Sequence, residues 1–264
     1  MQRISFFGFG LFAHAMFLVV FAYMAAFVGG FLVPWTIDSP ATTAPLPVAL
    51  AVNLLLLGAF GVQHSVMARP GFKKWWTQFV PQPIERSVYV MISNLLVIAM
   101  FLWWQPIDIV IWNITNPVAR GAMWGLFAAG WVLIPAASLL INHFDLFGTR
   151  QVWLHLVGKP YAHLPFRTPM LYRLVRHPLY VGWTIAFWAI PTMTVGHLMF
   201  ASVLTLYMLI AIRFEERDLV AHFGEVYENY RRRVPMMIPV RYRPAARDEA
   251  VIVSAPAEVE LRVQ

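Results

Sequence analysis

The stretch LYVGWTIAFWAIPTMTVGHLMFASVLTLYMLIAI (179–212) contains 34 consecutive residues without Asp, Glu, Lys or Arg. As a single helix it would be about 51 Å long at about 1.5 Å per residue. The hydrocarbon core of a bilayer is only about 30 Å thick. Pro191 and Gly196 bracket the segment TMTV, and both residue types interrupt helices. The stretch therefore predicts a helical hairpin of two short membrane spans with a tight turn near 191–197.

Four further uncharged windows are each long enough to cross a bilayer as a helix, which takes about 20 residues. They cover 6–33, 46–67, 87–107 and 121–142. With the hairpin, they predict an all-α integral membrane protein with about six transmembrane helices. We expect one membrane domain over 1–264, with a four-helix part (1–142), a module containing a loop and the hairpin (143–240), and a loosely ordered tail (241–264).

Composition supports a membrane protein and excludes several classes of chemistry. The chain is 59% hydrophobic and 12% charged, against roughly a quarter charged in soluble domains. It contains no Cys, which excludes disulfides, iron–sulfur clusters and thiol nucleophiles. The net charge of +7 fits a membrane surface better than nucleic acid in so apolar a chain.

The distribution of Lys and Arg predicts how the chain is oriented. The connections 34–45 and 105–119 have neither residue, whereas 69–76, 143–178 and the chain after 212 are basic. Because basic loops stay in the cytoplasm, both termini are expected on the cytoplasmic side of the inner membrane. Window 6–33 lacks the short apolar region and cleavage site of a signal peptide, so we interpret it as a retained span.

The sequence RHPLYVGW (176–183) lies where the hairpin begins. Pro178 suits the first turn of a helix, where its missing N–H is no loss, which places His177 at the cap. The free N–H groups and positive dipole end of a helix N-terminus favour an anionic ligand. We therefore predict an anion-binding position at Pro178.

Neighbouring residues strengthen this prediction. Arg173 and Arg176 add positive charge, Tyr180 lies in the first turn, and Gly182 allows a ligand or another backbone to come close. The alternative is that both arginines only anchor the span at the membrane surface and that His177 is an interfacial cap.

Carboxylates at the far end of the hairpin favour a binding pocket. Glu215 and Glu216 follow the second span, and Tyr227 and Tyr230 lie three residues apart on one helix face. A hairpin brings residues 177 and 215 to the same membrane face. The carboxylates could accept from hydroxyls or an amine, and the Tyr rings could pack on a base.

RHPLYVGW, the apolar hairpin and EERDLVAHFGEVYENYRRRVPMMIP (215–239) together resemble the C-terminal module of the isoprenylcysteine carboxyl methyltransferase superfamily. The resemblance implies a cytoplasmic cofactor pocket for S-adenosylmethionine at the membrane surface. On it we expect Glu216 to face the pocket in preference to Glu215. The pocket residues that it implies are His177, Tyr180, Gly182, Glu215, Glu216, Tyr227 and Tyr230.

Three more segments are similar to the bacterial methanethiol S-methyltransferase group: 54–76, 83–106 and 140–153. This resemblance, which covers most of the chain from about residue 50, implies methylation of a small thiol to give dimethyl sulfide. The expected partners are that thiol and membrane lipid, without nucleic acid, metal or an obligate protein partner.

A small thiol is mostly protonated at neutral pH, so the reaction needs a group that accepts its proton. The segment NHFDLFGTRQVW (142–153) offers His143 as base, Asp145 to hold or polarise it, and Arg150 and Gln151 to position the loop or cofactor. His64 is a second candidate base, although a histidine bonded to a neighbouring helix is the commoner case. His14 and His197 are expected away from the site.

Three alternatives remain open. The methyl acceptor could be a prenylated Cys carboxylate or a lipid amine, which would need a tunnel between helices. His64 and His143 could instead bind haem in an isomerase or redox protein. A transporter or sensor would require charged residues within several spans, and these spans contain none.

Overall fold

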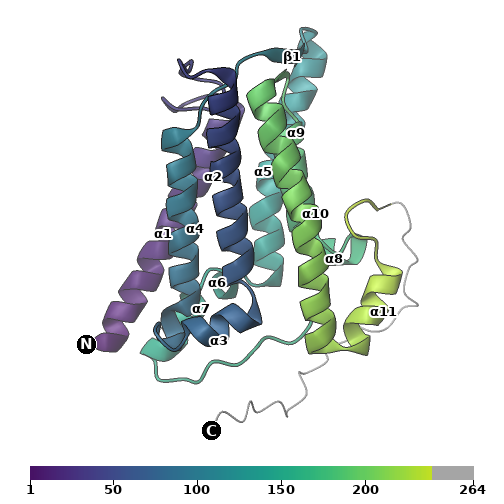
Figure 1. Cartoon of the computed structure of the whole chain (residues 1–264). Coiled ribbons are helices and arrows are strands. Elements are labelled where there is room, and N and C mark those ends of the chain that lie inside the picture. The colour runs from purple at the N-terminus through teal and green to yellow at the C-terminus, as the bar shows by residue number, and fades with distance from the viewer. Residues whose placement is uncertain (240–264) are drawn as a thin grey trace.

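The computed structural model describes residues 1–239, so the prediction for the tail lies outside the described part of the chain. Five of its helices are long and apolar enough to cross a membrane (Figure 1). They are α1 (Gln2–Gly29), α2 (Leu46–Met67), α4 (Gln82–Trp103), α5 (Pro117–Ile141) and α10 (Val195–Phe223). The predicted all-α, multi-pass membrane fold is confirmed.

The hairpin is present, but its two arms differ. The first arm consists of α9 (Pro178–Trp188), followed by an extended segment that includes β2 (Thr192–Thr194), and the second is the 29-residue α10. At about 1.5 Å per residue, the 11 residues of α9 cover only about 16 Å, whereas the 29 residues of α10 cover about 44 Å, more than the hydrocarbon core of about 30 Å. The prediction of two short helical spans was therefore wrong for α10.

The non-helical segment finds its partners within the protein. Ile190 and Met193 are buried, and β2 pairs antiparallel with β1 (Val110–Asn113). The backbone N–H of Gly196 donates to Ile107 O at 3.0 Å. Non-helical backbone within a membrane protein needs such internal partners, since lipid supplies none.

Helices α5 and α9 pack closely through two glycines. A Cβ on Gly130 would lie 2.6 Å from Ala186 N, and one on Gly182 would lie 2.9 Å from Ile134 Cγ1. Gly182 thus allows the close approach of another backbone, which is one of the two roles expected from the sequence. This contact fixes α9, and with it the start of the hairpin, against α5.

Gly130→Ala is expected to destabilise the protein by about 1–3 kcal/mol, the usual cost of overpacking. The new methyl group would collide with the backbone of α9, which cannot move aside as a flexible side chain can. Thermal unfolding in detergent measures the effect. Gly125→Ala on the same helix is the control, because a Cβ there meets nothing within 4 Å; equal stability of the two variants would contradict the packing argument.

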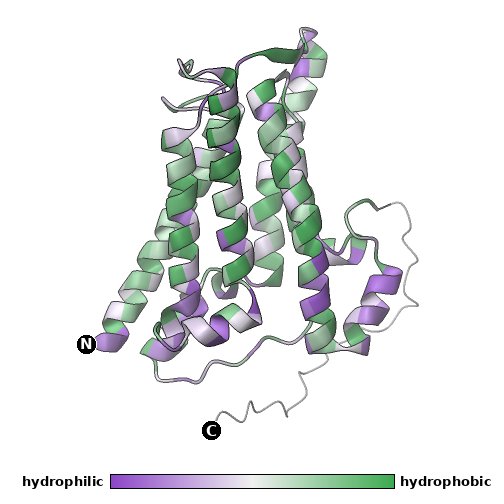
Figure 2. Ribbon diagram, viewed as in Figure 1, coloured by the Kyte–Doolittle hydropathy of each residue, from purple (hydrophilic) through white to green (hydrophobic). Residues whose placement is uncertain are grey.

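Five short helices gather at the end of the bundle where α1 begins, which we call the basic end (Figure 1). Figure 2 shows hydrophilic residues concentrated there and apolar residues along the long helices. This end therefore holds the polar side chains from which a site could be built. The helices are α3 (Pro70–Trp76), α6 (His143–Leu146), α7 (Thr149–Leu156), α8 (Leu171–Leu174) and α11 (Glu225–Arg233).

Candidate active site

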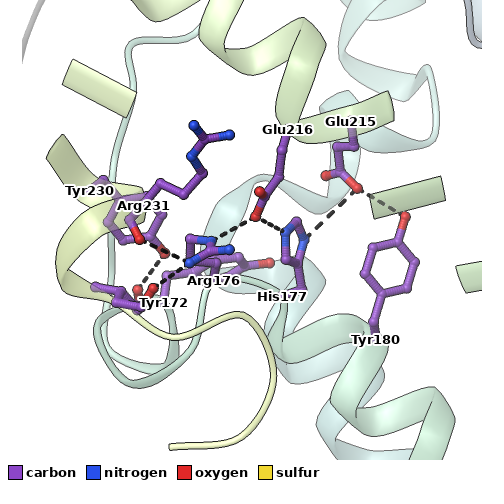
Figure 3. Close-up of polar contacts among 9 residues, drawn as sticks. Tyr172, Arg176, His177, Tyr180, Glu215, Glu216, Tyr230 and Arg231 are labelled. Carbon is purple, nitrogen blue, oxygen red and sulfur yellow. Dashed lines mark hydrogen bonds and ion pairs between the residues drawn. The ribbon is translucent and has the colours of Figure 1, made fainter. Parts of the chain in front are cut away.

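Polar side chains from the two arms of the hairpin meet at the basic end, where α9 begins and α10 leaves the bundle (Figure 3). His177 Nε2 lies 3.0 Å from Glu216 Oε1, and His177 Nδ1 lies 3.9 Å from Glu215 Oε2. The prediction that residues 177 and 215 meet is confirmed. We call this group the carboxylate cluster; its members are Arg176, His177, Tyr180, Glu215 and Glu216.

Glu216 is the buried acid of the cluster. Its Oε1 accepts from Arg176 Nε at 2.7 Å, and 11% of each of these two side chains is exposed. Arg176 also donates from Nη1 to Arg231 O at 3.0 Å and to Val234 O at 2.6 Å. Because its guanidinium is occupied by these partners, Arg176 ties the start of α9 to α10 and to the end of α11.

Glu215 is the accessible acid, with 43% of its side chain exposed. Its Oε2 accepts from the hydroxyl of Tyr180 at 2.9 Å, and its Oε1 has no hydrogen-bond partner within residues 1–239. Adjacent helical residues point about 100° apart, which explains why one acid is buried and the other open. Glu215 therefore has an acceptor atom available for a ligand.

The two tyrosines of α11 pack inside the protein. Tyr227 is 2% exposed, with its ring edge-to-face against Phe166, and the Tyr230 hydroxyl donates to Tyr172 O. Burial raises the pKa of both phenols, so both stay protonated at neutral pH. Arg173 is exposed, and its Nε donates to Thr168 O at 3.2 Å.

Pro178 occupies the first position of α9, as predicted, and His177 makes no side-chain cap hydrogen bond. The backbone N–H of His177 donates to Met236 O at 3.1 Å. The first turn of α9 therefore starts without a capping side chain, beside the carboxylate of Glu215.

A second polar group surrounds Asp145, in the segment after α5. Its Oδ1 accepts from Arg150 at 2.8 Å, and its backbone O accepts from Gln151 at 3.1 Å. The Tyr161 hydroxyl donates to Oδ2 at 3.3 Å. Burial, followed by the negative charge of Asp145, raises the pKa of Tyr161. The expected contact of Asp145 with His143 is not formed, because on the one-turn helix α6 the carboxylate faces Arg150.

His143 bonds to histidine and serine instead. Its Nε2 lies 3.0 Å from His14 Nε2, and its Nδ1 lies 2.9 Å from Ser138 Oγ. The expectation that His14 lies away from the site was thus wrong, because His14 bonds to this candidate base. His197, also expected away from the site, is fully buried and bonds to Phe187 O. A histidine within an otherwise apolar span was the available signal for His14, since such residues need polar partners.

His64 lies on α2 and faces α4. Its Nδ1 is 3.3 Å from Ser93 Oγ, and Ser93 in turn donates to Gln63 Oε1 at 3.1 Å. Its ring packs against Tyr89 and Phe60. His64 therefore joins α2 to α4, and its partners differ from those of His143.

Comparisons with known proteins find several relatives that share one name. The chain is 52% identical to a methanethiol S-methyltransferase of Crocosphaera subtropica, over 88% of this chain and 90% of that protein. It is 49% identical to a methanethiol S-methyltransferase of Mycobacterium tuberculosis, over 89% and 96%. Human nurim is 31% identical over 66% of this chain and 68% of its own length.

No family model matches the chain. No solved structure matches it either. The kinship therefore rests on relatives that match over most of both proteins. At 52% and 49% identity over nearly the whole of both proteins, the chain belongs to the methanethiol S-methyltransferase family.

Proposed function

We propose that this protein transfers a methyl group from S-adenosylmethionine to methanethiol, giving dimethyl sulfide. The observation that carries the proposal is the match in sequence and length to relatives named for this activity. The carboxylate cluster and the His143 segment supply polar side chains at one end of an apolar bundle. By the distribution of Lys and Arg, we place that end and both termini on the cytoplasmic side of the inner membrane.

The residues of the carboxylate cluster fit S-adenosylmethionine. The cofactor has an amine and ribose hydroxyls that can donate to the open Glu215 Oε1, and a carboxylate that suits the uncapped start of α9. Arg176 is engaged with Glu216, so the helix N-terminus rather than this arginine would hold the carboxylate. When bound, the cofactor supplies a methyl group activated by a positively charged sulfur.

The residues of the chain must then remove the thiol proton and exclude water. Burial lowers the pKa of His143, so its ring is neutral at neutral pH and can accept a proton. The rings of Phe144 and Phe147 flank it. We propose His143 as the base, and Asp145, Arg150 and Gln151 as residues that hold its segment in place.

The test is headspace detection of dimethyl sulfide from purified protein supplied with methanethiol and S-adenosylmethionine. Equimolar dimethyl sulfide and S-adenosylhomocysteine are expected. A peptide with a prenylated Cys and a phospholipid amine serve as competing acceptors, and preferential methylation of either would contradict the proposal. A Soret band in the purified protein would favour the haem alternative.

Glu215→Ala is expected to weaken S-adenosylmethionine binding by about tenfold or more, the effect of losing a hydrogen bond to a charged group. Calorimetry on the detergent-solubilised protein measures the affinity. Tyr180→Phe should have a smaller effect, because it removes only the group that orients Glu215.

Glu228→Ala is the matched control, because Glu228 is another accessible acid at the basic end and forms only an exposed pair with Arg232. Unchanged affinity in Glu215→Ala, or an equal loss in Glu228→Ala, would remove the cofactor from this position.

A further inference from the structure

Four side chains from four helices form one continuous hydrogen-bonded chain. Thr149 Oγ1 lies 2.7 Å from His14 Nδ1, His14 Nε2 lies 3.0 Å from His143 Nε2, and His143 Nδ1 lies 2.9 Å from Ser138 Oγ. Ser138 Oγ in turn donates to Pro135 O at 2.9 Å. Helices α1, α5, α6 and α7 thus each contribute one side chain to a single path.

One arrangement of the protons satisfies every contact in this chain. Ser138 has one hydroxyl proton, which goes to Pro135 O because a carbonyl oxygen has none to offer. Ser138 must therefore accept from His143 Nδ1–H, which leaves the lone pair of neutral His143 on Nε2. His14 then donates from Nε2 to His143 and accepts from the Thr149 hydroxyl at Nδ1. Every donor in the chain points from Thr149 toward Pro135.

The Thr149 end of this chain is open. Thr149 Oγ1 donates to His14 but accepts from no donor within residues 1–239. Aromatic side chains pack against the two histidine rings, with Phe147 stacked on His14 at 5.4 Å and Phe17 beside both rings. A proton delivered to the open oxygen therefore has a prepared path inward.

The charged groups around the path do not block this transfer. Asp145 on α6 is paired with Arg150 on α7 at 2.8 Å. Arg86 on α4 donates to Leu146 O at 3.0 Å, beside the same segment. No carboxylate touches either ring in the described chain, so the rings share a proton with each other rather than with an acid.

We propose that Thr149 receives the thiol proton and that His14 relays it to His143. The S–H bond breaks with its electron pair left on sulfur, and an O–H bond forms on Thr149. The former hydroxyl proton moves to His14 Nδ1, and the proton on His14 Nε2 moves to His143 Nε2. The products are a thiolate and a positively charged His143 ring, which keeps its hydrogen bond to Ser138. The inference rests on the proposed function, because the thiol is the acid.

The test compares Thr149→Val, which removes the hydroxyl at nearly constant shape, with Thr149→Ser, which keeps it. Thr149→Val is expected to lower kcat/KM for methanethiol about 10²-fold near neutral pH and to recover at alkaline pH, whereas Thr149→Ser stays within a few-fold of the parent. His14→Phe should cause a similar loss that does not add to that of Thr149→Val, since either change interrupts the same path. S-adenosylmethionine affinity and thermal unfolding show whether each variant is folded.

The matched control is His155→Phe. His155 also lies on α7 and stacks on α1 through Phe6, at 5.6 Å, outside the path. The pH profile of His155→Phe should equal that of the parent. Thr149→Val with parental turnover and pH profile would overturn the relay, as would equal losses in the Val and Ser variants.

Nitrogen NMR of the histidine rings tests the relay without any reaction. The relay requires His14 protonated on Nε2 and His143 protonated on Nδ1, assigned by comparison with His14→Phe. His14 protonated on Nδ1 would overturn it even in an active enzyme. Correct ring protonation in a protein that forms no dimethyl sulfide would instead contradict the proposed function, and with it the thiol as proton source.

Discussion

His143→Ala is expected to lower the rate constant for dimethyl sulfide formation at neutral pH by about 10² to 10⁴-fold, the range of general base catalysis. Burial lowers the pKa of His143 below its ordinary value of about 6.5, so the parent keeps a neutral base down to that pH and loses activity only in more acidic solution. S-adenosylmethionine affinity should remain near the parental value, because His143 lies outside the carboxylate cluster.

Alkaline pH should partly restore the His143→Ala variant. Without the base, the rate follows thiolate that forms in solution, and thiols such as an unperturbed Cys ionise only at about pH 8.5. A pH–rate profile of both proteins measures this shift.

The control is Asp145→Asn. Asp145 bonds to Arg150, Gln151 and Tyr161 rather than to His143, so its change should disturb only the loop and cause a smaller loss. Parental turnover of His143→Ala at neutral pH would contradict the assignment and direct the search to His64.

Hydrophobicity predicted the long helices well, because the apolar character of each window depends only on the residues within it. Window 46–67 coincides with α2, and window 121–142 lies within a few residues of α5. The first arm of the hairpin could not be predicted in this way. Its non-helical part is held by residues far away in the sequence, including β1 about eighty positions earlier, and hydropathy carries no information on that pairing.

In the candidate site, too, local features could be predicted and a contact between distant parts of the sequence could not. Turning the chain near Pro191 was enough to predict that His177 and Glu215 meet. The partner of His143 could not be found from its own segment, because His14 is 129 positions away on α1. Asp145, only two positions away, was the wrong partner for a different reason: residues two apart on a helical turn point in different directions.

Glu216 presents the sharpest difference between sequence and structure, since the resemblance favoured it over Glu215 as the pocket residue. The structure buries Glu216 against Arg176 and His177 and leaves an oxygen of Glu215 open. Replacing Glu216 would leave the guanidinium of Arg176 largely buried without a counter-charge. Its remaining partners, Arg231 O and Val234 O, are neutral.

Glu216→Ala is therefore expected to cost about 3–5 kcal/mol of stability, the usual effect of removing one partner from a buried ion pair. Glu215→Ala, one residue away and accessible, should leave thermal unfolding nearly unchanged while weakening cofactor binding. Adding Arg176→Met to Glu216→Ala should recover part of the stability, because the unpaired buried charge is then gone. Thermal unfolding of the three variants in detergent measures these differences. Equal stability of Glu216→Ala and Glu215→Ala would show that the Arg176–Glu216 pair does not hold the two arms of the hairpin together.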